Sequence, residues 1–249
     1  MNNNKNRARQ TAPISELRLV YDAWLQTPAP DFNGALRVVA GERIREALRQ
    51  TVERAGVQQA LPEFLAHWKA GRPVWIWSDL HLGHEAILRH AQRPFGSAQH
   101  MQQGLRDKAL SIGITPTDWL VCLGDLSFVG DAEVRAWLRD IPGRKLLILG
   151  NHDVDGRQNK NPLRWGMDVV TDCLELPAGP HQRLWLTHYP IGAAHVPDGV
   201  INVHGHIHQR VIDGGRHLNV CVEHTGYGPV LLQDGLDRPH RTAQDAAGG

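Results

Sequence analysis

Residues 74–81 read Val-Trp-Ile-Trp-Ser-Asp-Leu-His, a short apolar run that ends in a carboxylate and an imidazole. A run of this length, rich in β-branched and aromatic residues, is typical of a buried strand. Residues two apart in an extended chain share a face, so Asp79 and His81 point the same way while Leu80 turns into the core. The stretch therefore predicts a core strand that presents two metal-ligand side chains at its carboxyl end.

Four more signals follow in order along the chain, and most of them also end an apolar run. They are Gly124-Asp125, Gly150-Asn151-His152-Asp153, Thr187-His188 and Gly205-His206-Ile207-His208. In open α/β sheets, binding sites form beyond the carboxyl ends of the strands, and nearly every signal occupies such a position. Each signal alone is more often a turn or a surface feature. The complete ordered set favours one shared site.

Together the signals supply two carboxylates, one amide and four imidazoles, which is a ligand set for two divalent cations. The candidate ligands are Asp79, His81, Asp125, Asn151, His188, His206 and His208. Two metal ions ~3.5–4 Å apart clamp a phosphoryl group for in-line displacement and lower the pKa of a bridging water. Mixed oxygen and nitrogen ligands suit manganese, iron, zinc, cobalt or nickel, and we expect manganese.

Length and composition restrict the class of protein. The 249 residues leave room for one large domain with a small appendage, and the net charge of +1 gives no overall nucleic-acid signature. The three cysteines are scattered, and Cys122 and Cys221 lie inside apolar runs as small core residues. No apolar run approaches the ~20 residues of a membrane span, and no signal segment follows the start. We therefore expect a cytoplasmic protein without a membrane span.

The pattern divides the chain into three parts. Residues 1–72 predict a disordered start and a helical N-terminal extension, residues 73–236 the domain that holds the signals, and residues 237–249 a polar tail. Within the extension, Leu17, Trp24, Ile44 and Leu48 belong to helical patterns, and a third helix begins at Leu61. We expect the extension to cover the sheets, and a recruitment or oligomerisation arm is the alternative.

From residue 73 onward, apolar runs alternate with amphipathic stretches. The expected strands are 74–77, 119–123, 146–149, 184–186, 200–203, 218–222 and 230–232, and the expected helices are 85–92, 98–112 and 132–140. Helices separate the early strands, and we expect hairpins to dominate among the late ones. This order predicts an α/β fold, a two-sheet sandwich flanked by helices.

On these motifs the sequence resembles the calcineurin-like metallophosphoesterase superfamily over about residues 74–232. Further stretches are similar to a subgroup of small bacterial and phage phosphoesterases: Ser78-Asp79-Leu80-His81-Leu82-Gly83-His84, Arg93-Pro94-Phe95, Gly143-Arg144-Lys145 and Gly226-Tyr227-Gly228-Pro229-Val230. The resemblance implies a four-layer αββα architecture, with the N-terminal helical segment outside it as an appendage.

The resemblance also implies a role for each candidate. One metal would be held by Asp79, His81, Asp125 and His208, and the other by Asp125, Asn151, His188 and His206. His152 would bind no metal but lie near the phosphate, where it stabilises the transition state or protonates the leaving oxygen. Protein phosphatases of the superfamily place an acidic partner for this histidine shortly after the Gly-Asp motif. Here Leu126-Ser127-Phe128 follows instead, which argues against a protein phosphatase.

Four residues near the motifs have less specific signals. His84 follows His81 by three residues and could reach the substrate, or could open the helix that starts near residue 85. Arg93 could clamp a phosphate or brace its loop, and we retain both His84 and Arg93 as candidate substrate-binding residues. For Glu223 and His224 we expect support of their loop.

The predicted function is metal-dependent phosphoester hydrolysis, above all by a phosphodiesterase that uses a metal-bridging hydroxide. A phosphoester is the expected substrate, and nucleotides or single-stranded nucleic acid are candidates. The alternatives are a phosphomonoesterase acting on small molecules or nucleotides, and a non-catalytic metal-binding module. His152 argues against the last, because metal binding alone does not require it. No feature of the sequence points to an oligomeric state.

Overall fold

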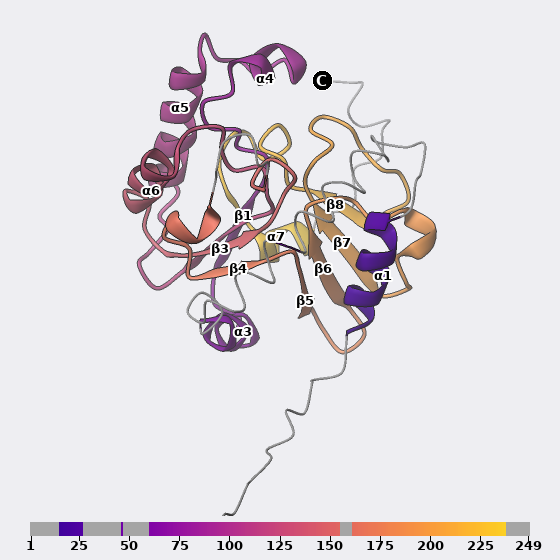
Figure 1. The fold of residues 1–249 in the computed structure, drawn as a ribbon. Helices are drawn as coiled ribbons and strands as arrows, with labels where there is room; N and C mark the ends of the chain where they lie inside the picture. The colour runs from indigo at the N-terminus through magenta and orange to yellow at the C-terminus, as the bar shows by residue number, and fades with distance from the viewer. Residues whose placement is uncertain (1–14, 27–45, 47–59, 155–160, 238–249) are drawn as a thin grey trace, which may run out of the picture.

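The computed structural model of the chain describes residues 15–26, 46, 60–154 and 161–237. Two mixed β-sheets pack against each other, and helices flank them, as Figure 1 shows. The predicted α/β sandwich with a helix at its N-terminal side is therefore confirmed. The predicted disordered start, the helical pattern around Ile44 and Leu48, and most of the predicted tail lie outside the described residues.

The first sheet has the order β4-β3-β2-β1-β9. Its strands are β1 (Val74–Trp77), β2 (Trp119–Cys122), β3 (Arg144–Ile148), β4 (Val169–Thr171) and β9 (Val230–Leu231). Strands β1 to β4 run parallel, and only β9 pairs antiparallel, with β1. The parallel direction brings the carboxyl ends of β1, β2 and β3 to one edge, where the first three signals follow.

The helices of the first half connect these strands and cover their outer face. They are α4 (Glu85–His90), α5 (Ala98–Ser111) and α6 (Asp131–Arg139), and Figure 1 shows α5 and α6 beside the first sheet. Trp77 is buried and stacks on Trp137 of α6 at 6.0 Å between ring centroids, so it belongs to the core as expected. A short helix, α7 (Leu232–Asp237), follows β9 and was not predicted.

The second sheet has the order β5-β6-β7-β8. Its strands are β5 (Cys173–Pro177), β6 (Arg183–Thr187), β7 (Val200–His204) and β8 (His217–Asn219). Only β5 and β6 form a hairpin, whereas β6, β7 and β8 run parallel. The expectation that hairpins dominate the late strands is therefore wrong. Loops, one of them with the turn η3 (Ala193–His195), make the crossovers that parallel strands require.

The chain segment after β8 joins the two sheets. Cys221 forms an isolated parallel bridge with Ser78, and the backbone N–H of Val222 donates to Ser78 O at 3.1 Å. The chain therefore passes from the second sheet to the end of β1 in the first. This crossing explains why the predicted strand 218–222 ends early, at Asn219.

Two N-terminal helices pack on the sandwich. Helix α1 (Glu16–Gln26) buries Leu17, Tyr21 and Leu25 and lies beside the second sheet in Figure 1. Helix α3 (Leu61–Lys69) buries Phe64 against Trp119, with 5.1 Å between ring centroids, in the core between the sheets. These contacts agree with a covering role, while the boundaries at residues 72 and 236 stay a prediction. Of the helices that the structure describes, none has the length and apolarity to cross a membrane.

The attachment of α1 depends on one ion pair that can be tested. Arg18 donates hydrogen bonds from Nη1 and Nη2 of its guanidinium group to the two carboxylate oxygens of Asp172, whose side chain is fully buried. Arg18→Met should lower the free energy of unfolding by about 3 kcal/mol, because it leaves a buried carboxylate without its counter-charge. Urea unfolding measures the effect.

Two further variants control this measurement. The double variant Arg18→Met/Asp172→Asn should regain part of the loss, because no buried charge remains. Leu19→Ala on the exposed face of α1 should change the stability by no more than about 0.5 kcal/mol. An Arg18→Met protein as stable as the parent would show that the ion pair does not anchor α1.

Candidate metal centre

The structure brings all seven predicted ligands to one place. They follow the carboxyl ends of β1, β2, β3, β6 and β7, so both sheets contribute. His81 Nε2 lies 3.7 Å from Asp79 Oδ1 and 3.7 Å from Asp125 Oδ2. On the other side, His188 Nε2 lies 3.5 Å from Asp125 Oδ2 and 3.1 Å from Asn151 Oδ1. Asp125 therefore faces ligand-type groups from both sheets.

The remaining imidazoles complete two groups around Asp125. The ring of His208 lies 5.2 Å from that of His81, and the ring of His206 lies 5.1 Å from that of His188. Among the described residues, Asp79, His81 and Asp125 can offer ligand atoms within 4.8 Å of one another, and so can Asp125, His188 and His206. Two cation sites that share Asp125 match this arrangement.

The backbone at the site is held in an uncommon conformation. Positive φ is rare for residues other than glycine, yet five of the seven candidate ligands adopt it. They are Asp79 (φ 59°), His81 (φ 53°), Asp125 (φ 51°), His206 (φ 70°) and His208 (φ 50°). Such residues cost free energy and cluster at functional sites, where the surrounding structure enforces them. The repeated conformation turns each side chain from its strand toward the common centre.

Two glycines allow the strand ends to approach this closely. A Cβ on Gly124 (φ +91°) would lie 2.6 Å from the backbone N of Gly150 and 2.6 Å from His188 Nδ1. A Cβ on Gly205 would lie 2.3 Å from Asp79 Oδ2. The glycines of the Gly-Asp and Gly-His-x-His motifs are therefore required by close packing beneath the ligands.

The charges of the site fit a bound cation. Burial alone would raise the pKa values of Asp79 and Asp125, but the imidazoles around them hold both well below the ordinary range. Burial would also lower the pKa of His188, yet the Asp125 carboxylate more than offsets it and raises the pKa to about 9. Without metal, a proton on His188 thus compensates the carboxylates, and a divalent cation would displace it.

Individual atoms support the same fit. Asp79 Oδ1 and His81 Nε2 are buried, and none of the described residues offers either atom a hydrogen bond. His188 Nδ1 donates to Leu123 O at 2.7 Å, so once a metal ion displaces the proton on Nε2, that nitrogen offers its lone pair on the side of Asp125. Buried polar atoms without partners are rare, and a lone pair and a carboxylate oxygen are what a metal ion requires.

Asp153 is a residue of the site to which the sequence analysis gave no role. It is fully buried and accepts hydrogen bonds from the backbone N–H groups of Asp125 at 2.9 Å, Leu126 at 2.9 Å and Gly150 at 2.8 Å. Burial and the neighbouring Asp125 raise the pKa of Asp153 to about 6. Its carboxyl group therefore ties the end of β2 to the end of β3.

A buried ion pair supports the other side of the centre. Arg93 contacts Glu223 through Nε at 2.9 Å, and Glu223 Oε1 accepts a hydrogen bond from His208 Nδ1 at 3.1 Å. Arg93 also donates to the backbone oxygens of Asp79 at 2.6 Å and Leu80 at 3.0 Å. A carboxylate on the outer nitrogen of a metal-binding histidine fixes its tautomer and orientation. Glu223 therefore leaves His208 Nε2 free for a metal.

These contacts change the interpretation of Arg93. Its side chain is completely buried and bound to Glu223 and to two backbone oxygens, so it is not available to a substrate. The structure thus contradicts the predicted substrate-binding role and favours the bracing alternative. Glu223 does more than the loop support expected of it, whereas His224 contacts the loop through Nε2 and His208 O at 2.8 Å.

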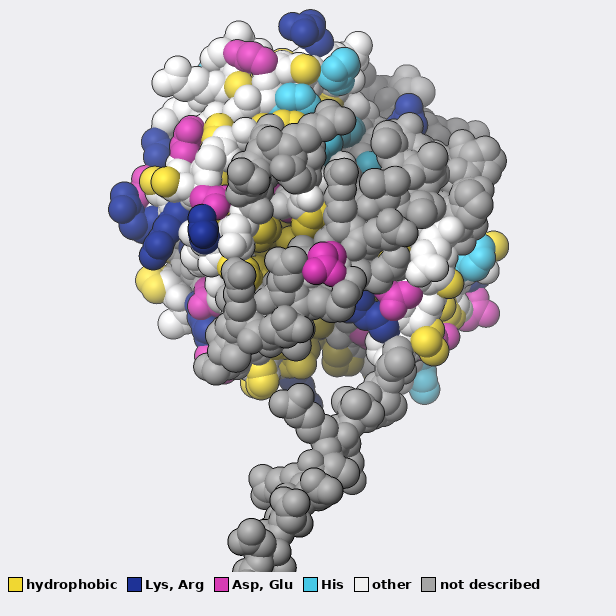
Figure 2. Space-filling view, in the orientation of Figure 1, with side chains coloured by type: hydrophobic (Ala, Val, Ile, Leu, Met, Phe, Trp, Pro, Cys, Tyr) yellow, Lys and Arg dark blue, Asp and Glu magenta, His cyan; other side chains and the backbone are white. Residues whose placement is uncertain are grey.

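His84 lies beside His81 at the edge of the site. It precedes α4 without capping it by its side chain, and its Nδ1 lies 3.1 Å from His81 Nδ1. The ring stacks on Phe128 at 3.9 Å between centroids. Figure 2 shows histidine side chains reaching the surface together near α4 in the upper part of the molecule. His84 is therefore positioned to orient His81, and its substrate-binding role stays a prediction.

His152 lies at the edge of the site, next to the candidate ligand Asn151. Its backbone N–H donates to Asp125 Oδ1 at 2.8 Å, while Nε2 lies 3.9 Å from Asp125 Oδ2. About a third of the side chain (34%) is exposed, in contrast to the fully buried His188. The ring of Phe128 lies 4.6 Å from that of His152, measured between centroids.

Comparisons with known proteins agree with this geometry. A family model described as calcineurin-like phosphoesterase matches residues 72–242. The chain is 30% identical to the Gene 66 protein of Mycobacterium phage L5, over 65% of this chain and 90% of that protein. It is 26% identical to the protein MJ1445 of Methanocaldococcus jannaschii, over 65% of this chain and 88% of that protein. The phage match agrees with the predicted subgroup.

One solved structure supports the fold alone. The protein AQ665 of Aquifex aeolicus, described as a protein of unknown function, aligns with a TM-score of 0.51 and 23% sequence identity. The alignment covers 66% of this chain and 97% of that one.

The Glu223 contact generates a prediction about metal affinity. Glu223→Gln keeps the shape of the side chain but removes the charge that orients His208. It should weaken the binding of one ion per chain by about 10–100-fold and leave the other nearly unchanged. A manganese titration in which electron paramagnetic resonance detects the free Mn²⁺ measures both affinities.

Asp168→Asn is the control, because this carboxylate pairs with Arg144 at the opposite end of β3. It should leave both affinities as in the parent protein. Equal affinities in the Glu223→Gln and parent proteins would refute the positioning role of Glu223.

Proposed function

The chain belongs to the calcineurin-like phosphoesterase family, and we propose that it is a phosphodiesterase that works with two divalent metal ions. The observation that carries this proposal is the convergence of seven ligand-type side chains around the shared carboxylate of Asp125. A site for one metal would not need ligands from five strands.

The proposed division of ligands follows the two groups in the structure. Asp79, His81, Asp125 and His208 would hold one ion, and Asp125, Asn151, His188 and His206 the other. When bound, the two ions supply a lowered pKa for an attacking water and charge neutralisation for the phosphate. The mixture of oxygen and nitrogen donors supports manganese as the ion.

His152 is the group that we assign to the leaving oxygen. Its Nε2 stays near Asp125, and its exposed part faces outward, so the ring can hold a proton where a substrate binds. A positioned acid lowers the barrier most for leaving groups that need protonation. Phe128 in place of an acid beside it supports a substrate other than a phosphoprotein.

The rim of the site supports a substrate that carries an aromatic group near the phosphate. His84 and Phe128 are both half-buried and stack with an interplanar angle of 15°, next to His152. Aromatic side chains of this kind stack with nucleobases without regard to base identity. We therefore propose nucleotide diesters or single-stranded nucleic acid as the substrate class. Phosphomonoesters of small molecules are the alternative.

The first test compares diester and monoester hydrolysis. The full chain reconstituted with manganese should show a higher kcat/KM on bis-p-nitrophenyl phosphate than on p-nitrophenyl phosphate, with 2′,3′-cyclic nucleotides and single-stranded DNA assayed alongside. Asp125→Asn should lower kcat/KM by more than the ~10–100-fold typical of groups that only orient a ligand, because the Asp125 carboxylate would serve both ions. His81→Asn and His206→Asn are the matched variants, and each should lower kcat/KM less than Asp125→Asn does. A higher kcat/KM on the monoester would favour the phosphomonoesterase.

The second test separates catalysis from metal binding. His152→Ala should lower kcat by about 10²–10⁴-fold on substrates with poor leaving groups and by less on p-nitrophenyl esters. Its metal content, measured by elemental analysis, should equal that of the parent protein. Loss of one ion per chain would make His152 a ligand, and full activity on a poor leaving group would remove it from the mechanism.

A further inference from the structure

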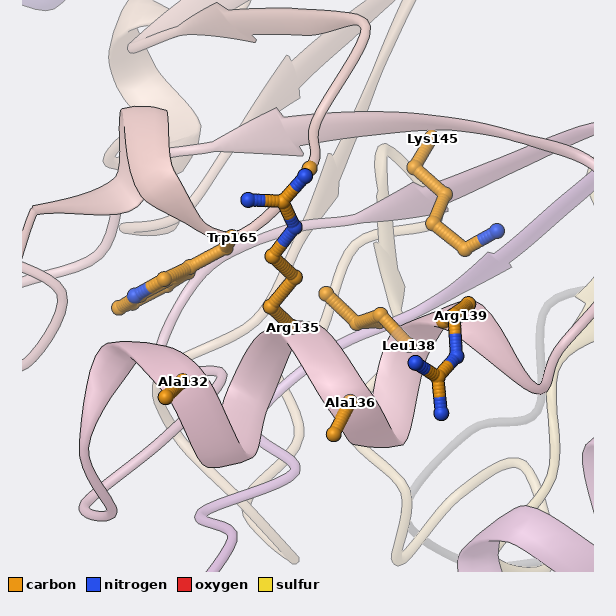
Figure 3. Close-up of a pocket in the computed structure, with 8 residues that line it drawn as sticks. Ala132, Arg135, Ala136, Leu138, Arg139, Lys145 and Trp165 are labelled. Carbon is orange, nitrogen blue, oxygen red and sulfur yellow. The ribbon is translucent and has the colours of Figure 1, made fainter.

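A second feature lies away from the metal centre, in a groove beside α6. The groove has a volume of about 510 Å³ and is lined by α6, the start of β3 and the segment after the turn η2 (Pro162–Arg164). Figure 3 shows the side chain of Arg135 standing between Trp165 and Lys145. Lys145 begins β3, whereas the ligand Asn151 follows its end. Their separation of six positions along the chain places the two sites about 15–20 Å apart.

The groove lies beside the third crossover of the first sheet, between β3 and β4. The described residues of this crossover form only the short turn η2, so no described helix of the crossover covers α6 on this side. Leu138 and Trp165 form apolar walls, and the aliphatic part of Arg135 lies 3.9 Å from where a Cβ of Gly166 would be. Apolar walls with a few polar groups are typical of sites for small molecules.

The polar groups of the groove all carry positive charge. Arg135, Arg139 and Lys145 line it, and none of its lining residues is acidic. Within the part of the chain that the structure describes, Arg135 has no carboxylate within ion-pair distance, and Arg139 has only Asp140, at 3.7 Å. The groove is therefore complementary to an anion.

The environment of Lys145 is a second reason, independent of the shape of the groove, to expect an anion there. Its side chain is 9% exposed, and Nζ donates to Ile141 O at 2.8 Å and Gly143 O at 2.7 Å. An ammonium group has three donors, and the described residues offer the third no acceptor. Burial lowers the pKa of Lys145, and Asp168, which accepts a hydrogen bond from the backbone N–H of Lys145, offsets this only in part. Among the described residues no carboxylate oxygen forms an ion pair with Nζ, so the ammonium group keeps a donor and positive charge for an anion in the groove.

We propose that this groove is a second ligand site, which binds an organic phosphate monoester through Lys145, Arg135 and Arg139 and holds its apolar part against Leu138 and Trp165. Three cationic groups match the two negative charges of a monoester better than the single charge of a carboxylate. The site also gives a role to Lys145 of the Gly-Arg-Lys motif, which the metal centre does not use. The proposal does not depend on the proposed activity.

The test is calorimetric titration of the full chain with phenylphosphonate, which carries a ring and a dianion and is not hydrolysed. The titration is done on metal-loaded protein and again with excess chelator, so that binding at the metal centre is identified by its loss. A saturable component should remain with chelator. Lys145→Met and Arg135→Gln should each weaken it about tenfold, the usual loss for a hydrogen bond to a charged group.

Controls define what would overturn the proposal. Arg164→Gln removes an exposed arginine of η2 that does not line the groove, and it should leave binding unchanged. Benzoate and methylphosphonate should bind several-fold more weakly, because benzoate carries only one negative charge and methylphosphonate lacks the ring. Arg135 is exposed, so its variant remains informative if Lys145→Met does not fold. The proposal fails if no component survives chelation, if neither groove variant weakens it, if Arg164→Gln weakens it equally, or if benzoate binds as tightly.

Discussion

The burial of two carboxylates beside each other is the constraint on which the rest of the structure depends. Asp79 and Asp125 are 0% and 2% exposed, and they follow neighbouring parallel strands. Unpaired charges in such a place are costly, and removing one partner of a buried set costs about 3–5 kcal/mol. Backbone N–H groups compensate part of the charge, since His206 N donates to Asp79 Oδ2 and His152 N to Asp125 Oδ1, each at 2.8 Å. Bound cations would compensate the remainder.

A layer of buried side chains keeps this arrangement in place. Asp153 joins the ends of β2 and β3, and Arg93 joins the end of β1 to Glu223. Cys221 belongs to the same layer, because its Sγ lies 3.2 Å from Asp79 Oδ2, the oxygen that Ser78 and His206 also contact. The other oxygen, Oδ1, is the one without a partner. This layer therefore directs Asp79 Oδ1 toward the centre, and the left-handed conformations of the ligands persist because their neighbours enforce them.

The sequence predicted the parts of this design that depend on local pattern. Each ligand follows an apolar run, and parallel strands bring such positions together, so the fold class and the convergence of seven residues could be inferred. Strands β4 and β5 were not predicted, because they are edge strands whose short runs mix polar with apolar residues. Hairpins were expected where loops cross over, since a loop carries no periodic signal. The contacts of Glu223, 15 residues from His208 and 130 from Arg93, are likewise invisible to local pattern.

The most direct test of the account is where metal ions bind. Anomalous diffraction from crystals grown with manganese should show two peaks per chain, ~3.5–4 Å apart, on either side of the Asp125 carboxylate. One peak should lie with His81 and His208, and the other with His188 and His206. A single peak, or peaks that do not contact Asp125, would contradict the claim that this carboxylate joins two metal sites.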